Sequence, residues 1–225
     1  MHKHIALLRR SNDLDHEEFV DHWQAADLES AFDDVVRYHE VVPTMPDHAE
    51  FDGLAEFFFE DWDTLQDALG SGGAVLSELD HEFADAIGTE RGMAGKAIVQ
   101  RDDVDGDTDD LYKHSAFLVR KSDLSHQEFV DHWQHNHTPI AREITGVVKY
   151  DTVVPEESAG EPFDGVAELY FDELDALYDA LGSEGSRDYD ASGEMAEKAR
   201  ADVDNFLAID ERPRLIGRER LVAGR

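Results

Sequence analysis

The sequence predicts an α+β fold built from two tandem ferredoxin-like units. Three observations predict it: the chain contains one pattern twice, each copy orders its elements as strand, helix, strand, strand, helix and strand, and an acidic segment without hydrophobic periodicity joins the copies. These observations divide the chain into a first unit at 1–101, a linker at 102–110 and a second unit at 111–225.

The internal repeat is visible as direct identity. Residues 3–24 and 113–134 align at a constant offset of 110, and 15 of these 22 positions are identical. The offset then becomes 112, at which 51–59 matches 163–171. Chance does not produce this similarity, so we interpret the chain as a tandem duplication in which the first helix of the first copy ends two residues earlier.

The first helix of each unit has the clearest start signal. The segments 15–18 (Asp-His-Glu-Glu) and 125–128 (Ser-His-Gln-Glu) have the pattern of a capping box. Phe129 and Trp133, four residues apart, then share one face of the second unit's helix.

Strands are predicted at 147–154 and 165–171 in the second unit. In the latter strand, Val166, Glu168 and Tyr170 share one face, and the residues between them share the other.

The rest of each unit is expected to be a second helix and a last strand. In the second unit the helix is predicted at 173–181 and ends at Gly182. The last strands are predicted at about 93–100 and 213–222. Helices of a ferredoxin-like unit cover one sheet face only, so the other face needs a partner, which the second copy supplies.

Charge and composition exclude several classes of function. The formal net charge is −33, from 53 acidic and 20 basic side chains, and there is no cysteine. Disulfides, Cys-ligated metals and thiol nucleophiles are therefore excluded, and the charge repels nucleic acid and anionic lipid. Such an acid excess is typical of halophilic proteins, because concentrated salt screens self-repulsion. We expect the arginine-rich end at 212–225 to pair with the acidic first half.

No apolar run is long enough to span a membrane, and the first residues lack the apolar stretch of a signal peptide. We therefore expect a cytoplasmic protein without a membrane partner.

Residues 120–141 resemble the EthD family. The matching features are a basic residue that closes the first strand, then Leu-Ser-x-x-Glu-Phe, then Trp, then His-x-Pro four residues later. The match continues through Lys149, Tyr150 and 163–171, and it covers nearly all of 112–222.

The resemblance implies a dimeric α/β barrel, in which two ferredoxin-like units pack sheet to sheet, and here both units belong to one chain. It also implies a role in the breakdown of small organic compounds or the tailoring of aromatic polyketides. The wider superfamily includes cofactor-free monooxygenases, isomerases, cyclases and decarboxylases, and some haem proteins.

His137 is the first candidate for catalysis. It matches the histidine of the family's His-x-Pro motif, followed by Pro139, and a neutral imidazole near pH 7 acts as a general acid or base. Asp27 and Glu29 stand at the corresponding positions of the first copy. We therefore expect a working site in the second unit and a degenerate one in the first. The alternative is a helix-end histidine bonded to a backbone carbonyl.

Glu168 and Tyr150 are the other catalytic candidates. A mid-strand carboxyl group with apolar neighbours has a raised pKa and can act as an acid, and the Tyr150 hydroxyl would orient a substrate oxygen. Glu56 takes the place of Glu168 in the first copy. The presence of this glutamate in both copies favours a structural role, such as a bond to a backbone N–H or to an arginine across the barrel.

The substrate pocket is expected between the first helix and the sheet of the second unit. Its expected residues are aromatic or adjacent to the aromatic helix face: Phe117, Trp133, Tyr150, Tyr170 and His132. His132 has a counterpart in the first copy, His22, and this favours a role in packing.

No metal site and no cofactor are expected. His132 and His135 could share a helix face, but a zinc or iron site would need carboxylates from elsewhere in the fold. Proton transfer is the chemistry that the chain performs unaided. We therefore expect a cofactor-free isomerase, cyclase, decarboxylase or monooxygenase acting on a small organic molecule. Two alternatives stay open: a haem-binding protein with His137 as axial ligand, and a ligand carrier without catalysis. Self-association beyond the two units also stays open.

Overall fold

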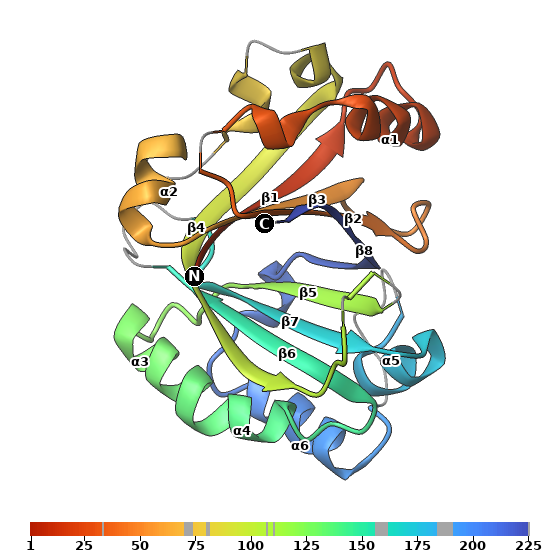
Figure 1. The fold of residues 1–225 in the computed structure, drawn as a ribbon. Helices are drawn as coiled ribbons and strands as arrows, with labels where there is room; N and C mark the ends of the chain where they lie inside the picture. The colour runs from red at the N-terminus through yellow and green to blue at the C-terminus, as the bar shows by residue number, and fades with distance from the viewer. Residues whose placement is uncertain are drawn as a thin grey trace.

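Eight antiparallel strands close into one barrel, and the helices cover its outside (Figure 1). The strands are β1 (His2–Arg10), β2 (Arg37–Pro43), β3 (Gly53–Phe59), β4 (Ile87–Asp102), β5 (Tyr112–Leu118), β6 (Val147–Val154), β7 (Gly165–Phe171) and β8 (Arg214–Gly224). They follow one another round the barrel as β1-β3-β2-β8-β5-β7-β6-β4. This computed structural model describes residues 1–32, 34–69, 74–79, 82–106, 108–109, 111–155, 162–183 and 191–224.

The helices lie on the two outer sides of the barrel (Figure 1). They are α1 (His16–Ala25), α2 (Trp62–Leu69), α3 (His126–His132), α4 (Thr138–Ala141), α5 (Leu174–Leu181) and α6 (Glu194–Val203). A π-helical turn, η4 (Trp133–His137), joins α3 to α4. Short 3₁₀ segments are η1 (Leu28–Ser30), η2 (Leu76–Glu78), η3 (Glu82–Ala86) and η5 (Ile209–Glu211).

The two halves of the chain repeat one pairing pattern. β1 pairs with β3 from His2 and Phe59 onward, and β5 pairs with β7 from the equivalent residues Tyr112 and Phe171 onward. The halves are joined by hydrogen-bonded strands, since β4 pairs with β6 and β2 pairs with β8. The predicted α+β fold of two ferredoxin-like units in an intrachain α/β barrel is confirmed.

Individual elements follow the sequence signals closely. The strands predicted at 147–154 and 165–171 coincide with β6 and β7, and both predicted capping boxes are formed. Gly182 ends α5 with a φ of 79°, in the left-handed region that glycine adopts without a Cβ clash. β4 and β8 are longer than predicted because each pairs along its length with a strand of both halves.

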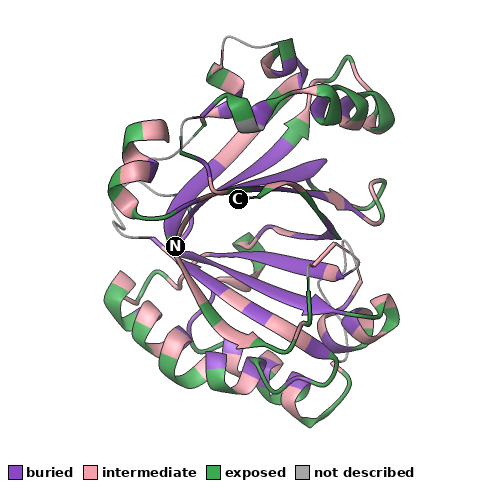
Figure 2. Ribbon diagram, in the orientation of Figure 1, coloured by how far each residue is buried: buried purple, intermediate pink, exposed green. Residues whose placement is uncertain are grey.

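Most residues of the barrel strands are buried whether they point inward or outward (Figure 2). Outward-pointing residues pack beneath the helices in two separate apolar clusters, one for each half. Inward-pointing residues fill the barrel. One end of this interior is apolar and includes Ile5, Leu54, Phe117, Val166 and Leu215. The other end holds charged side chains.

The charged interior consists of two lysines and three glutamates from both halves. Lys3 Nζ lies 2.6 Å from Glu168 Oε2 and 2.9 Å from Glu56 Oε1. Lys113 Nζ lies 2.6 Å from Glu56 Oε1, 2.9 Å from Glu168 Oε1 and 2.8 Å from Glu219 Oε2. Each lysine therefore binds a glutamate of its own half and one of the other half. We name these five residues the barrel ion cluster.

The ion cluster is balanced by one proton. Burial and the neighbouring charge of Glu168 raise the pKa of Glu56 to about 8. Burial alone would raise the pKa of Glu168 as well, but the charges of Lys113 and Lys3 hold it below its ordinary value. The Glu56–Glu168 pair therefore keeps one proton near neutral pH, and the two lysines then face two ionised carboxylates.

The acidic segment between the halves is bound to β8. The Thr108 hydroxyl donates a hydrogen bond to Glu219, and the backbone N–H of Leu221 donates to Asp109 Oδ1 at 2.7 Å. The expected pairing of the arginine-rich end with the first half is confirmed by Arg220 Nη2 and Glu40 Oε2, which are 2.5 Å apart.

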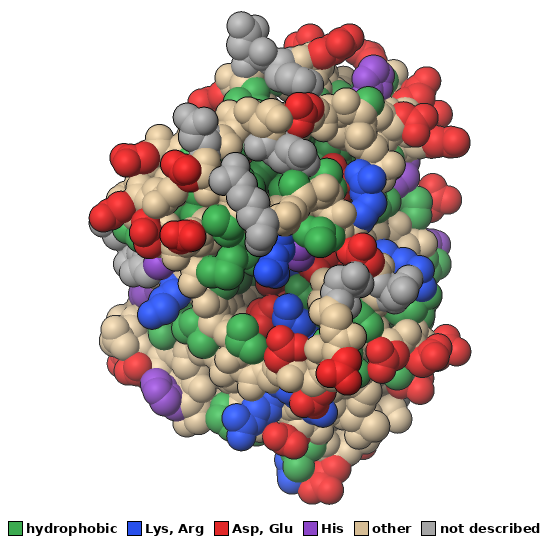
Figure 3. All heavy atoms as spheres, viewed as in Figure 1, with side chains coloured by type: hydrophobic (Ala, Val, Ile, Leu, Met, Phe, Trp, Pro, Cys, Tyr) green, Lys and Arg blue, Asp and Glu red, His purple; other side chains and the backbone are tan. Residues whose placement is uncertain are grey.

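On the face shown in Figure 3, acidic side chains are prominent over the outer parts of both halves, and lysines and arginines lie both near the middle and toward the lower edge. Within the described ranges, no helix has the length and apolarity needed to cross a membrane.

The ion cluster predicts a large stability cost when one cation is removed. Lys113→Met would leave Glu56 and Glu168 with Lys3 as their one lysine and would remove the lysine bound to Glu219. We therefore expect a loss of about 3–5 kcal/mol in the free energy of unfolding, measured by chemical denaturation. The exposed Lys198→Met on α6 is the control and should change it by less than about 0.5 kcal/mol. A loss below 1 kcal/mol for Lys113→Met would contradict the role given to the cluster.

The shared proton predicts a pH dependence of stability. A pKa of Glu56 raised from 4.5 to about 8 favours folding most at low pH, and the contribution is lost as pH rises through about 8. In Glu56→Gln this contribution is absent, so unfolding free energies measured from pH 6 to 8 should fall less steeply than in the wild type, by about 1.4 kcal/mol per pH unit. Equal slopes in both proteins would refute the shared proton.

Candidate functional site

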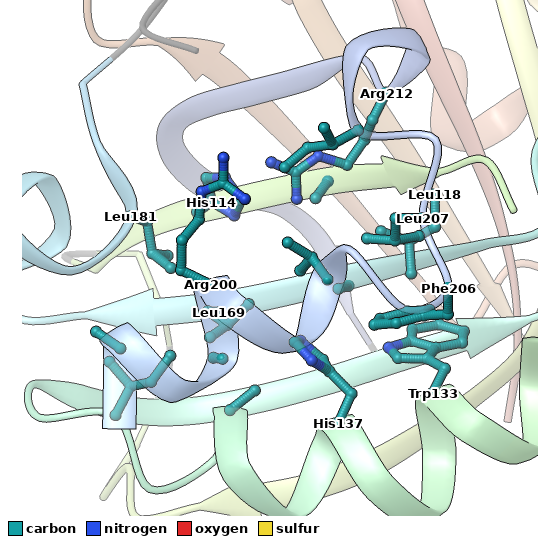
Figure 4. Close-up of a pocket in the computed structure, with 18 of the residues that line it drawn as sticks. His114, Leu118, Trp133, His137, Leu169, Leu181, Arg200, Phe206, Leu207 and Arg212 are labelled. Atoms are coloured by element: carbon teal, nitrogen blue, oxygen red, sulfur yellow. The ribbon is translucent and has the colours of Figure 1, made fainter. Parts of the chain in front are cut away.

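A pocket lies on the outer face of the second half's sheet, beneath the helices of that half (Figure 4). β5, β6 and β7 form one wall, and η4, α4 and α6 form the other. Its lining is largely apolar and includes Leu118, Trp133, Leu169, Val203 and Phe206. The cavity volume is about 60 Å³, so in this conformation it holds only a few water-sized groups. A larger ligand would therefore need the lining side chains to move apart.

His137 reaches this pocket because of a local irregularity in the helix. η4 spans Trp133–His137, and the N–H of Thr138 bonds to the carbonyl of Trp133, five residues earlier. Such π-turns insert an extra residue into a helix and are frequent at functional sites. In the first half, α1 instead ends at Ala25. The predicted difference in helix length between the copies is therefore the turn that presents His137.

Asp202 of α6 holds His137. His137 Nδ1 lies 3.0 Å from Asp202 Oδ2, and His132 Nε2 lies 3.1 Å from Asp202 Oδ1. Asp202 thus bridges two histidines of the first helix. An Nδ1–H donated to a carboxylate fixes the imidazole tautomer and leaves Nε2 with the lone pair. Figure 4 shows His137 projecting toward the pocket from its helix.

The electrostatics of this pair favour a neutral imidazole. Burial lowers the pKa of His137 below its usual 6.5, although the hydrogen bond and charge of Asp202 act in the opposite direction. Burial acts to raise the pKa of Asp202, but hydrogen bonds from Asn205, His132 and His137 hold it below its ordinary value. At neutral pH the pair is therefore an unprotonated histidine beside an ionised aspartate, the arrangement of a general base with its orienting carboxylate.

Tyr150 borders the same pocket, as expected. Its hydroxyl lies 3.4 Å from Thr138 Oγ1, and burial raises its pKa to about 12. Tyr150 therefore stays protonated at neutral pH and can donate a hydrogen bond but cannot act as a base.

Three predicted site residues lie elsewhere, inside the barrel. Glu168 belongs to the ion cluster, Tyr170 donates to Glu219 Oε2 at 3.0 Å, and the Phe117 ring packs 4.9 Å from that of Phe163. The expectation that they line a pocket beside His137 is wrong. Alternation along β5 and β7 sends them to the opposite face of the sheet. Glu168 has the structural role that its presence in both copies favours, but its partners across the barrel are lysines and not the expected arginine.

Of the two helix residues expected in the pocket, His132 and Trp133, one lines it and the other does not. Trp133 lines the pocket, whereas His132 lies behind it, with its ring 5.0 Å from Phe206 and its Nε2 on Asp202. His132 therefore supports the site without forming its wall.

The first half has no equivalent dyad among its described residues. Asp27 precedes η1 and makes no capping hydrogen bond through its side chain. Phe83 stacks against Trp23 with 6.3 Å between ring centres, and Phe32 packs 5.1 Å from Phe57. Aromatic side chains thus fill the space beneath the first half's helices.

One group of metal-ligand residues occurs within the described part of the barrel. Ligand atoms of His39, Glu56 and Glu219 lie within 4.8 Å of one another. Lys113 donates to both of these glutamates, so its ammonium already supplies the cation that they bind. His135, which shares a helix face with His132 in the sequence, bonds through Nδ1 to the carbonyl of Asp131 at 3.0 Å.

The structure adds three residues that the sequence did not reveal. Asp202 holds His137, while Arg200 and Arg212 line the pocket. The only signal in the sequence is the spacing of Ala196, Ala199 and Val203, which marks the buried face of α6. This spacing places α6 on the sheet but does not indicate which helix it faces.

Comparison with known proteins agrees with the fold. No curated protein matches the chain. An anthrone oxidase-like protein of known structure is similar over 99% of this chain and 93% of its own, with a TM-score of 0.63 and 12% identity. A putative monooxygenase from Lactobacillus acidophilus NCFM has a TM-score of 0.53 and 10% identity, over 98% of this chain and 94% of its own. A chlorite dismutase from Candidatus Nitrospira defluvii has a TM-score of 0.55 and 11% identity, over 97% and 90%.

These identities are low, so the structural likeness shows the fold alone. The sequence comparison is more specific: residues 121–210, which include the π-turn, His137 and Asp202, match the EthD domain family. The likeness to the EthD domain family therefore covers the part of the second half that holds most of the pocket lining.

Proposed function

We propose that the pocket of the second half is an acid–base active site for a small, largely apolar organic molecule. The observation that carries this proposal is His137 at a mostly apolar pocket, with Nδ1 bound to Asp202. The chemistry needs no cofactor. Folds labelled anthrone oxidase-like and putative monooxygenase support an organic substrate but do not identify it.

In this proposal His137 Nε2 accepts a proton from the substrate. The bond between that proton and the substrate breaks, its electron pair stays on the substrate, and Asp202 stabilises the imidazolium that forms. Tyr150 keeps its own proton and orients a substrate oxygen. Return of the proton to another carbon gives isomerisation, and attack of the carbanion on a carbonyl carbon of the same molecule, with the proton passed to the carbonyl oxygen, gives cyclisation. Oxygenation of the carbanion requires dioxygen as a co-reactant, and in a decarboxylation protonated His137 would give a proton to the carbanion that loss of CO2 leaves.

Haem binding is the second candidate. A histidine whose Nδ1 is held by a carboxylate is also the usual arrangement of a metal-ligating imidazole, so His137 fits the role of an axial ligand. The cavity volume of about 60 Å³ is far smaller than a tetrapyrrole requires, which places this candidate second. An absorption spectrum of the protein titrated with haemin tests it, since specific ligation produces a Soret band that His137→Ala abolishes.

The asymmetry between the halves predicts unequal effects of two matched substitutions. His137→Ala should lower turnover by about 10²–10⁴-fold, because the general base is lost, whereas Asp27→Ala in the first half should leave it unchanged. Both are measured on the small aromatic or lactone compound that a thermal-shift screen selects. Unchanged turnover in His137→Ala would refute the site, and a larger effect of Asp27→Ala would reverse the assignment of the halves.

The role of Asp202 as a positioning residue predicts a shift in the pH profile. The wild-type rate should fall only below pH 6.5, because the pKa of His137 is lowered by burial. Asp202→Asn removes the charge that raises this pKa, so the acid limb should move to lower pH while the maximal rate drops. The control is Asp172→Asn, an exposed aspartate outside the pocket lining. A slower enzyme with an unmoved acid limb would mean that Asp202 is merely structural.

A further inference from the structure

The charged side chains in the described lining of the pocket, Arg200 and Arg212, are opposite in sign to the protein as a whole. The chain has 53 acidic and 20 basic side chains. The pocket lining includes Arg200 and Arg212 and no aspartate or glutamate among its described residues. A ligand in this pocket therefore meets two guanidinium groups, and the described lining residues include no carboxylate.

Both arginines point to the same end of the pocket. Arg200 comes from α6 and Arg212 from the segment before β8, and in Figure 4 their guanidinium groups approach each other beside His114, away from His137. The nearest carboxylate described at Arg200 is Asp204, 3.7 Å from Nη1 and 73% exposed, which makes it a weak competitor for a ligand.

The imidazoles add no positive charge of their own at neutral pH. Burial, followed by the charges of Arg214 and Arg212, lowers the pKa of His114 well below its ordinary value. Burial likewise lowers that of His137, with a further contribution from Arg212. The charge of Arg212 is thus felt at both ends of the pocket, and the arginines are its fixed cations.

We propose that this pocket selects molecules with one oxyanion on an apolar body, and that Arg200 and Arg212 bind the oxyanion. This inference rests on the proposed function for its catalytic meaning but not for its binding test. Guanidinium groups match the planar oxygens of a carboxylate or an enolate. The apolar body would lie on Leu118, Leu169 and Phe206, between the arginines and His137.

The placement also links recognition with the proposed reaction. The arginines hold the oxyanion end of the molecule, so the opposite end of its apolar body faces His137, which removes the proton there. Arg200 and Arg212 are then specificity-determining residues that position the substrate for the reaction.

Paired probes test the proposal directly. Calorimetric titration at fixed ionic strength compares benzoate, cyclohexanecarboxylate and 1-naphthoate with their neutral amides. The wild type should bind at least one carboxylate at least about tenfold more tightly than its amide. Arg200→Gln and Arg212→Gln should each remove most of that preference while leaving amide binding unchanged. The matched control is Arg142→Gln, an exposed arginine outside the pocket lining, which should keep the preference.

Each outcome of these titrations supports or overturns the proposed anion selection. If no carboxylate binds more tightly than its amide, or if Arg142→Gln removes the preference as well, the proposal is wrong. A variant that loses amide and carboxylate binding equally has lost its fold, and the other arginine variant then decides. Binding to His137→Ala separates the two proposals: intact preference for carboxylates with unchanged turnover refutes the catalytic site but leaves anion selection standing.

Discussion

The structure depends on a constraint of its barrel: its strands are buried on both faces. Neighbouring residues of one strand therefore point alternately into the charged interior and onto the apolar outer face beneath the helices. On β7, Glu168 and Tyr170 enter the charged interior, while Ala167 and Leu169 border the pocket. A strand without a solvent-facing side offers no water to an unpaired charge, so interior ions require partners within the barrel. The ion cluster meets this requirement with residues of both halves, and the same closure leaves the outer face apolar enough to form a pocket.

The two halves show how a small local change separates two sites built on the same strand pairing. Trp23 donates to the Tyr38 hydroxyl at 2.8 Å in the first half, and that hydroxyl donates to Glu40. In the second half the tyrosine, Tyr150, faces Thr138 instead, a residue that the π-turn brings over the sheet. The extra turn thus redirects the hydrogen bonding beneath the helix. It also places His137 within reach of Asp202 on α6. The shorter α1 of the first half ends at Ala25 and has no such turn.

The sequence predicts the fold better than the site for a physical reason. Repeats, caps and strand alternation act over a few residues, so they define β6, β7 and α5 almost to the residue. Alternation also identifies which residues of β7 share a face, but it does not say whether that face points to the helices or into the barrel. Glu168 was therefore grouped correctly with Tyr170 and placed on the wrong side. His137 was found through its motif, whereas its partner Asp202 is distant in the chain and is brought near only by tertiary packing.

Net charge and pocket charge act over different distances. A protein with a formal charge of −33 repels an anion at long range, but salt at about 1 M screens this repulsion within about 3 Å. Contacts inside a pocket are shorter than that and are less exposed to counterions, so Arg200 and Arg212 keep their effect when the surface field is lost. An acidic exterior is therefore compatible with an anion-selective site wherever added salt screens the long-range repulsion and leaves the local attraction. The same reasoning holds for the ion cluster, whose charges lie where salt does not reach.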